Sequence, residues 1–194
     1  TLLFQGRKMK VLILNGSPRK NGKLSQILHC IESNAKQKNE VLFFNVNELE
    51  FKSCVGCMAC RKTNVCSLPK DDASMIAKNI KKCDAIVVGT PVYWANMNGD
   101  LKRLFDRLAG VLMSETKLGI PRPLLKGKKA YIVVTCTTPF PFNIFAGQST
   151  KASGAIKEVL VTAGFKIKGK FVLAGTKGMS EISQRNVRKI NRIF

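Results

Sequence analysis

Five short apolar runs alternate with helix-like segments along this 194-residue chain. Each run consists mainly of Val, Ile, Leu, Phe or Ala, which is typical of strands buried on both faces of a parallel sheet. The runs cover residues 11–14, 41–44, 85–88, 130–134 and 171–173. The alternation predicts an α/β fold, with a doubly wound five-stranded parallel sheet in the order 2-1-3-4-5 and helices on both faces.

The segments between these runs predict the covering helices. Apolar residues recur at helical spacing at positions 24, 27, 28 and 31, and again between 101 and 108. Further helices are expected over about 71–82, 150–163 and the C-terminal residues. The hydrophobic content of 45% is enough for one core, so we expect a single domain over residues 9–194. Residues 1–8 look like the remnant of an expression tag.

The turn over residues 16–22 joins the first strand to the first helix. A helix N-terminus offers unpaired N–H groups to an anion, and Ser17, Arg19, Lys23 and Ser25 add hydroxyls and positive charge. The glycine spacing fits neither an NTPase loop nor the dinucleotide fingerprint. The terminal phosphate of a mononucleotide fits better. The alternative is an ordinary strand-to-helix turn with a capping serine.

The loops after the third and fourth strands would meet this turn at the same edge of the sheet. Residues 90–99 include Tyr93 and Trp94, whose aromatic faces suit a flat heterocycle, and the amides of Asn96 and Asn98. The alternative is that both aromatic side chains fill space between the loop and the next helix. The threonine-rich residues 135–138 would complete the pocket.

Four of the seven cysteines lie close together in the sequence. Cys54, Cys57, Cys60 and Cys66 give the spacing C-x2-C-x2-C-x5-C. A zinc ribbon needs two separated knuckles, so zinc is disfavoured, whereas one 4Fe-4S cluster suits closely spaced thiolates. The alternative is a cysteine-bearing loop that binds no metal. The isolated thiols are expected to act as small core hydrophobes; they are Cys30, Cys83 and Cys136.

Residues 16–22, 90–94 and 99–102 together resemble the flavodoxin-like NAD(P)H-dependent FMN reductases. The resemblance implies that FMN is the cofactor and NAD(P)H the co-substrate. At positions 23 and 24 the family commonly has Asn-Thr, and here Lys23 would replace a lost hydroxyl contact with charge. The implied cofactor-binding residues are Ser17, Arg19, Asn21, Gly22, Lys23 and Ser25 for the phosphate, Pro91, Val92, Tyr93, Trp94, Asn96 and Met97 for the isoalloxazine ring, with Thr135 and Thr137 completing the pocket.

The compact cysteine run is similar to that of the iron-sulfur flavoproteins, a branch of the same family. This resemblance implies a cluster near the flavin, often across a dimer interface, in a homodimer or homotetramer. The expected function is electron transfer from NAD(P)H through FMN, and through a 4Fe-4S cluster where one is held, to a protein, quinone or flavin acceptor. A non-enzymatic FMN and iron-sulfur electron carrier is the alternative. No residue stands out as an acid or base catalyst.

The chain is strongly basic, with 33 Lys and Arg against 12 Asp and Glu and a net charge of +21. This charge favours anionic ligands, but the basic residues occur in small groups and match no nucleic-acid-binding motif, so nucleic acid is the less favoured partner. The basic C-terminal positions 185–192 are expected to form a solvated helix face. Without an apolar stretch long enough to cross a membrane or a signal peptide, a cytoplasmic location is expected. Residues 139–145 form an apolar loop that suits a lid, a subunit contact or core packing.

Overall fold

The computed structural model describes residues 7–193, so most of the expected tag remnant lies outside the described residues. Its main sheet has five parallel strands in the order β2-β1-β3-β6-β7, which confirms the predicted fold class and strand order. The strands are β1 (Lys10–Asn15), β2 (Glu40–Asn45), β3 (Ala85–Pro91), β6 (Lys129–Thr135) and β7 (Lys166–Leu173).

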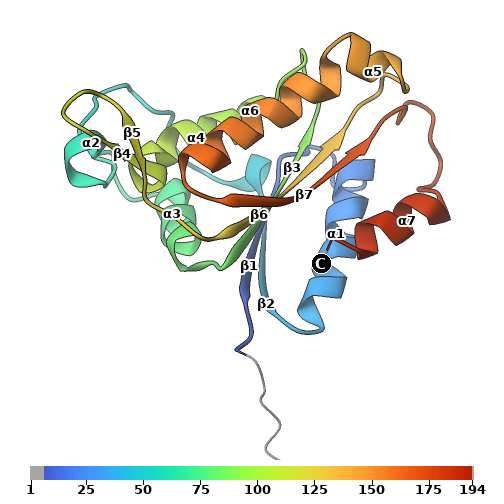
Figure 1. Cartoon of the computed structure of the whole chain (residues 1–194), viewed down its shortest axis with the longest axis horizontal. Helices are drawn as coiled ribbons and strands as arrows, with labels where there is room; N and C mark the ends of the chain where they lie inside the picture. Colours follow the sequence, from blue (N-terminus) through green and yellow to red (C-terminus); the bar gives the residue numbers. More distant parts are fainter. Residues whose placement is uncertain (1–6, 194) are drawn as a thin grey trace, which may run out of the picture.

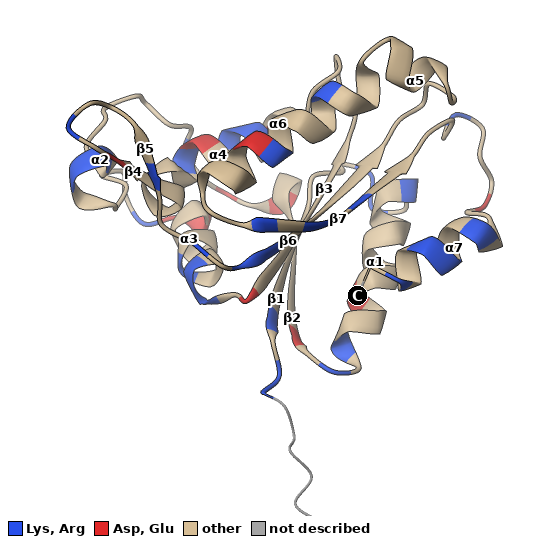
Figure 2. Cartoon of the chain, viewed as in Figure 1, with Lys and Arg blue, Asp and Glu red and all other residues tan. Residues whose placement is uncertain are grey.

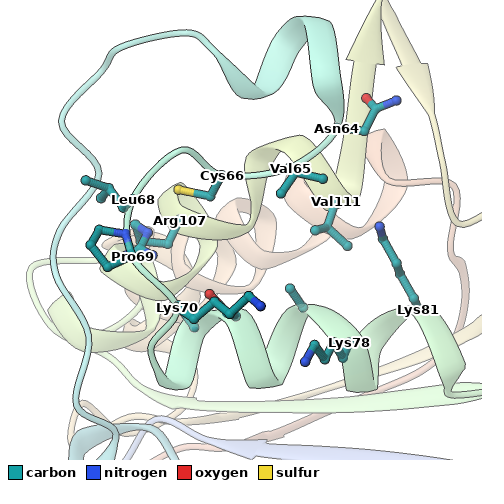
Figure 3. Close-up of a pocket in the computed structure, with 13 residues that line it drawn as sticks. Asn64, Val65, Cys66, Leu68, Pro69, Lys70, Lys78, Lys81, Arg107 and Val111 are labelled. Atoms are coloured by element: carbon teal, nitrogen blue, oxygen red, sulfur yellow. The ribbon is translucent and has the colours of Figure 1, made fainter.

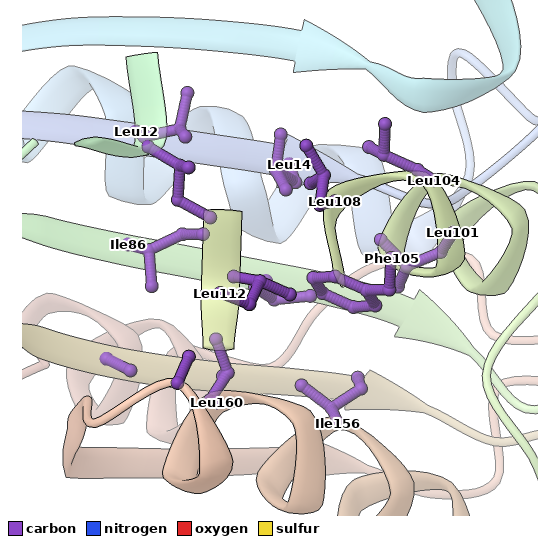
Figure 4. Packing of buried hydrophobic residues seen from close by; sticks show 14 of the residues in the cluster. Leu12, Leu14, Ile86, Leu101, Leu104, Phe105, Leu108, Leu112, Ile156 and Leu160 are labelled. Carbon is purple, nitrogen blue, oxygen red and sulfur yellow. The ribbon is translucent and has the colours of Figure 1, made fainter. Parts of the chain in front are cut away.

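Helices cover both faces of this sheet (Figure 1). Along β1, Val11 and Ile13 pack into one apolar cluster with α1 (Lys23–Lys36). Leu12 and Leu14 pack into the other cluster with α3 (Asp72–Lys82), α4 (Gly99–Leu112) and α6 (Gln148–Thr162). This alternation follows from the period of two along a strand. Figure 4 shows the second cluster, where Leu104 and Leu108 of α4 lie beside Leu14 of β1. The helices are α1 (Lys23–Lys36) and α7 (Gln184–Asn191) on one face, with α3 (Asp72–Lys82), α4 (Gly99–Leu112) and α6 (Gln148–Thr162) on the other.

Several short elements lie in segments for which the sequence predicted no helix or strand. Two of them, β4 and β5, pair as an antiparallel hairpin beside the main sheet. Elements of three or four residues are too short to show a periodic pattern, and two prolines in β5 hide it further. The short elements are η1 (Val46–Glu48), α2 (Cys60–Thr63), β4 (Met113–Glu115), β5 (Pro121–Pro123) and α5 (Phe142–Phe145).

The apolar loop over residues 139–145 lies on the surface. Phe145 is 81% exposed and Phe140 is 73% exposed, so core packing, one of the three expectations for this loop, is wrong. The other two expectations for this loop, a lid and a subunit contact, stay predictions.

Basic residues lie on helices and strands throughout the molecule (Figure 2). On α7, Arg185, Arg188 and Lys189 are exposed while Ile190 is buried in the apolar cluster that includes α1, which confirms the expected solvated basic face. Within residues 7–193, no helix has both the length and the apolar character needed to span a bilayer.

Candidate functional site

Asn15, the last residue of β1, organises the turn that follows. Its side chain is buried; Oδ1 accepts a hydrogen bond from the Ser17 N–H at 3.0 Å. Its Nδ2 donates to Ser25 Oγ and to Asn45 Oδ1, each at 3.0 Å. One amide therefore joins the strand, the turn, the first helix and the neighbouring strand. Our sequence analysis missed Asn15, although a polar residue ending an apolar strand is a signal for such a role.

Two hydroxyls and a close backbone approach fix the turn itself. The hydroxyls of Ser17 and Ser25 donate to the Arg19 carbonyl at 3.2 and 2.8 Å, and the Arg19 N–H donates to Ser17 Oγ at 3.1 Å. The Gly16 N–H donates to the Gly89 carbonyl at 2.9 Å. A Cβ on Gly16 would lie 2.8 Å from that carbonyl oxygen, so only glycine allows the turn to lie this close to β3.

The N-terminus of α1 faces the same turn without a side-chain cap. Gly22 is the N-cap residue and no acidic residue occupies the first helical turn. The helix dipole and its unpaired N–H groups are therefore available to an anion. Lys23 Nζ donates to the Ser180 carbonyl at 2.6 Å, which ties the start of α1 to the segment after β7.

These elements border a pocket of about 460 Å³ at the carboxyl edge of the sheet. The volume lies within the usual range for small-ligand sites, about 300–1,000 Å³. No Asp or Glu is among the lining residues, whereas three cationic side chains are. The lining residues are Ser17, Pro18, Arg19, Gly22, Lys23, Leu24, Pro91, Val92, Tyr93, Thr135, Thr137, Thr176, Lys177 and Gly178.

The structure thus brings most of the predicted cofactor-binding residues around one cavity. The others, Asn21, Ser25, Trp94, Asn96 and Met97, are not among its lining residues. Trp94 is 99% exposed, Met97 is buried in the core, and Ser25 lies behind the turn. For these residues, as for those that line the pocket, contact with a flavin stays a prediction.

One wall of the pocket was missed by sequence reasoning. Thr176, Lys177 and Gly178 follow β7 and line the cavity. The hydroxyl of Thr176 donates to the Cys136 carbonyl at 3.2 Å, which holds this segment against the end of β6. The sequence signal for this wall is the pair of glycines, Gly175 and Gly178, that follows the apolar run of β7. Both adopt a positive φ, which favours glycine in a tight loop.

The fit of a mononucleotide to this pocket rests on its shape and its donors. The anion-binding features gather at one end, where the turn meets α1, and apolar Pro91 and Val92 with Tyr93 lie along another wall. A phosphate monoester with a flat aromatic ring matches this division, so the residues present suit FMN.

The four clustered cysteines line a second, smaller pocket of about 70 Å³. All of them are free thiols. Among residues 7–193, no group of three or more His, Cys, Asp or Glu side chains is arranged to hold a metal ion. The four thiols therefore line the same pocket, but they are not arranged as the ligands of a metal ion. Their donor set suits an iron-sulfur cluster, and ligation would require the loop to close around it.

The electrostatics differ among these thiols. A hydrogen bond with Ser67 at 3.1 Å and a backbone hydrogen bond from Ala59 lower the pKa of Cys57. Burial instead raises the pKa of Cys60. Of the isolated cysteines, Cys83 and Cys136 are buried as expected, and burial raises the pKa of Cys83 to about 11. Cys30 is only half-buried at the edge of the apolar cluster, so the expectation of a core residue is not met there.

Arg107 joins the two ends of the cysteine segment to α4. Its Nη1 donates to the Lys52 carbonyl and, at 2.8 Å, to Asp71 Oδ2, while Nη2 donates to Asp71 Oδ1 at 3.1 Å. Asp71 also accepts from the Lys52 N–H at 3.2 Å and caps α3 through Ser74. Burial is the largest single influence and would raise the pKa of Asp71. The hydrogen bonds from Arg107 and from the backbone N–H groups of Lys52 and Ser74, together with the charge of Arg107, outweigh burial and lower the pKa. This ion pair therefore closes the segment that carries the thiols.

A glycine on the same helix lets the cysteine segment approach closely. A Cβ on Gly110 would lie 2.5 Å from Cys60 Cβ, closer than real side chains come. The absence of a side chain at Gly110 thus allows α2 to pack directly on α4.

Comparison with known proteins relates this arrangement to a family. The family model described as NADPH-dependent FMN reductase matches residues 9–141. An iron-sulfur flavoprotein of Archaeoglobus fulgidus is 37% identical over 110 residues, which cover 57% of this chain and 54% of the relative. One of Clostridioides difficile is 24% identical over 188 residues, covering 95% of this chain and 76% of the relative. The chain spans about half the length of several of the curated relatives that it matches.

Solved structures share the fold at low sequence identity. An FMN-dependent NADH-azoreductase from Bacillus anthracis, in complex with FMN, superposes with a TM-score of 0.74 at 15% identity, covering 95% of this chain and 96% of that one. An NAD(P)H:quinone oxidoreductase from Methanothermobacter marburgensis gives a TM-score of 0.71 at 17% identity, covering 95% and 94%. The family model covers more than half of the sequence and includes both the phosphate turn and the cysteine run, so this chain belongs to the NADPH-dependent FMN reductase family.

Proposed function

We propose that this protein is an FMN-dependent oxidoreductase that passes electrons from NAD(P)H to a protein, quinone or flavin acceptor. The observation that carries the proposal is the pocket at the carboxyl edge of the sheet, where an anion-binding turn lies beside apolar and aromatic walls. FMN, when bound, supplies the hydride and electron chemistry.

In this proposal, the residues of the pocket bind and orient the cofactor. The N–H groups at the start of α1, with Ser17 and Arg19, hold the phosphate. Pro91, Val92 and Tyr93 lie against the ring, and Thr135 with Thr137 offers hydroxyls to its polar edge. The positive charge of Lys177 would attract the phosphates of the co-substrate, whereas that of Arg19 would be paired with the phosphate of FMN.

Anaerobic mixing of the FMN-loaded protein with NADH or NADPH tests the enzymatic function. We expect one of the two to bleach the yellow absorbance with one hydride equivalent per FMN. If neither nucleotide reduces the bound FMN, while dithionite does, the protein is an electron carrier and the proposed reductase function is wrong.

We further propose that Cys54, Cys57, Cys60 and Cys66 ligate one 4Fe-4S cluster. Support comes from the four free thiols that line one small pocket and from the iron-sulfur flavoproteins among the relatives. In a single chain, the cysteine pocket and the flavin pocket share no lining residue. We therefore propose that a homodimer or homotetramer brings the cysteines of one subunit toward the flavin of another, with residues 9–194 acting as one domain.

Anaerobic reconstitution with iron and sulfide tests the ligands. The unchanged protein should take up about four iron atoms per chain, as a 4Fe-4S cluster requires, and Cys57→Ser with Cys60→Ser should lose most of that iron. Cys30→Ser is the matched control, because this half-buried thiol lies on α1 outside the cysteine pocket, and it should load normally. Equal iron in all three proteins would contradict the proposal and leave a cysteine loop that binds no cluster.

A further inference from the structure

A second large cavity lies between α3 and the segment over residues 64–70 (Figure 3). It measures about 460 Å³ and shares no lining residue with the flavin pocket. Neither the family match nor the proposed reductase function accounts for it. Its lining residues are Asn64, Val65, Cys66, Leu68, Pro69, Lys70, Ala73, Ser74, Ala77, Lys78, Lys81, Arg107 and Val111.

The walls of this cavity, which we call the α3 pocket, are mainly apolar. Ala73 and Val111 form buried parts of the wall, whereas Val65 is 60% exposed and lies where the pocket opens to solvent. Figure 3 shows Val65 and Val111 together, across the pocket from α3. A concave, largely apolar pocket of this size is typical of a small-molecule site.

The charge of the α3 pocket has one sign. Lys70, Lys78 and Lys81 line it and are exposed, and no Asp or Glu is among the lining residues. Within residues 7–193, none of these three lysines forms an ion pair, whereas the charge of Arg107 is already paired with Asp71. The exposed side of the pocket therefore carries positive charge that the protein does not balance.

We propose that the α3 pocket binds a small organic anion that has an apolar body, of the class of medium-chain or aromatic carboxylates. The apolar body displaces water from the pocket walls, and the carboxylate lies among the lysine ammonium groups. Cys66, Leu68 and Arg107 line both this pocket and the cysteine pocket, so the anion contacts the segment that carries the thiols. The proposal does not depend on the proposed redox function.

Titration of the FMN-loaded protein with octanoate, measured by calorimetry, tests the binding site. The titration is done at about 0.15 M salt, where long-range charge effects are screened. We expect saturable binding of one octanoate per chain. Acetate has the carboxylate without the long apolar chain, and 1-octanol has the chain without the charge. Each should therefore bind at least tenfold more weakly than octanoate. No saturable binding of octanoate, or equally tight binding of 1-octanol, would overturn the proposal.

Two sets of variants locate the site. Lys78→Gln with Lys81→Gln should weaken octanoate binding about 4- to 25-fold, since each exposed ion pair contributes about 2- to 5-fold. Lys82→Gln removes the next charge along α3, at a residue that does not line the pocket, and should leave binding unchanged. Equal weakening by both sets would mean general charge attraction and would overturn the proposal.

Ala77→Phe fills the pocket and should abolish octanoate binding while FMN binding, at the other site, persists as evidence of folding. Unchanged octanoate binding in this variant would place the anion elsewhere and overturn the proposal. If Ala77→Phe instead converts an oligomer into monomers, the pocket holds part of a second copy, which also overturns it. The lysine variants decide the matter independently should Ala77→Phe fail to fold.

Discussion

Replacing Ser17 by Ala together with Arg19 by Leu should weaken FMN binding by about 2–4 kcal/mol, roughly 30- to 900-fold in the dissociation constant. The change removes one charge-assisted and one neutral hydrogen bond to the phosphate, and it loosens the turn in which Ser17 bonds the Arg19 backbone. Quenching of flavin fluorescence during titration of the apoprotein measures the effect.

Lys20→Leu is the control for this change. Lys20 belongs to the same turn but pairs with Glu48 at 3.0 Å and does not line the pocket. Its loss should alter FMN binding by less than about 1 kcal/mol. If Lys20→Leu weakens FMN binding as much as the double change does, the phosphate is held by the general positive charge of the turn. The direct phosphate contacts assigned to Ser17 and Arg19 would then be wrong.

Replacing Arg107 by Leu should lower the free energy of unfolding by about 3–5 kcal/mol, because it leaves the carboxylate of Asp71 and the Lys52 carbonyl without their partner in a largely buried setting. Urea unfolding measures the loss. Lys102→Leu on the same helix removes an exposed pair with Asp106 and should cost less than about 1 kcal/mol. Equal losses would contradict the clamp that we assign to Arg107.

Acid should weaken the same pair. The folded-state pKa of Asp71 lies below its usual range, so its stabilising contribution is complete above the unfolded value of about 4 and disappears as the pH falls through the lower folded value. The stability difference between the unchanged protein and Arg107→Leu should therefore shrink below about pH 4. A difference that stays constant down to pH 2 would show that the ion pair is not its source.

The sheet could be predicted because its strands carry their own signal. Each strand shows an apolar run, and parallel strands joined by helices allow few arrangements. The strand β7 begins earlier than its apolar run predicts. In its first half, the exposed side chains of Lys166, Lys168 and Lys170 alternate with less exposed residues, so no continuous apolar run marks this part of the strand. The hairpin of β4 and β5 could not be predicted, since three-residue strands leave no pattern to detect.

The candidate sites were predictable only where a motif is continuous in sequence. The turn around Ser17 and the thiols of the cysteine run are local patterns, whereas Thr176 and Lys177 join the flavin pocket only through the fold. Likewise, Arg107 lies 36 residues from Asp71, and nothing in the periodicity of α4 distinguishes this arginine from its neighbours. Contacts of this kind depend on tertiary packing, which a single sequence does not encode in any local window.

Mass spectrometry of the cofactor released after incubation with equal amounts of FMN and FAD tests the central claim most directly. The turn provides for one terminal phosphate, so we predict that FMN is recovered at one per chain from a yellow protein. Recovery of FAD alone, or a folded protein that stays colourless in excess FMN, would contradict the assignment of the pocket as an FMN site.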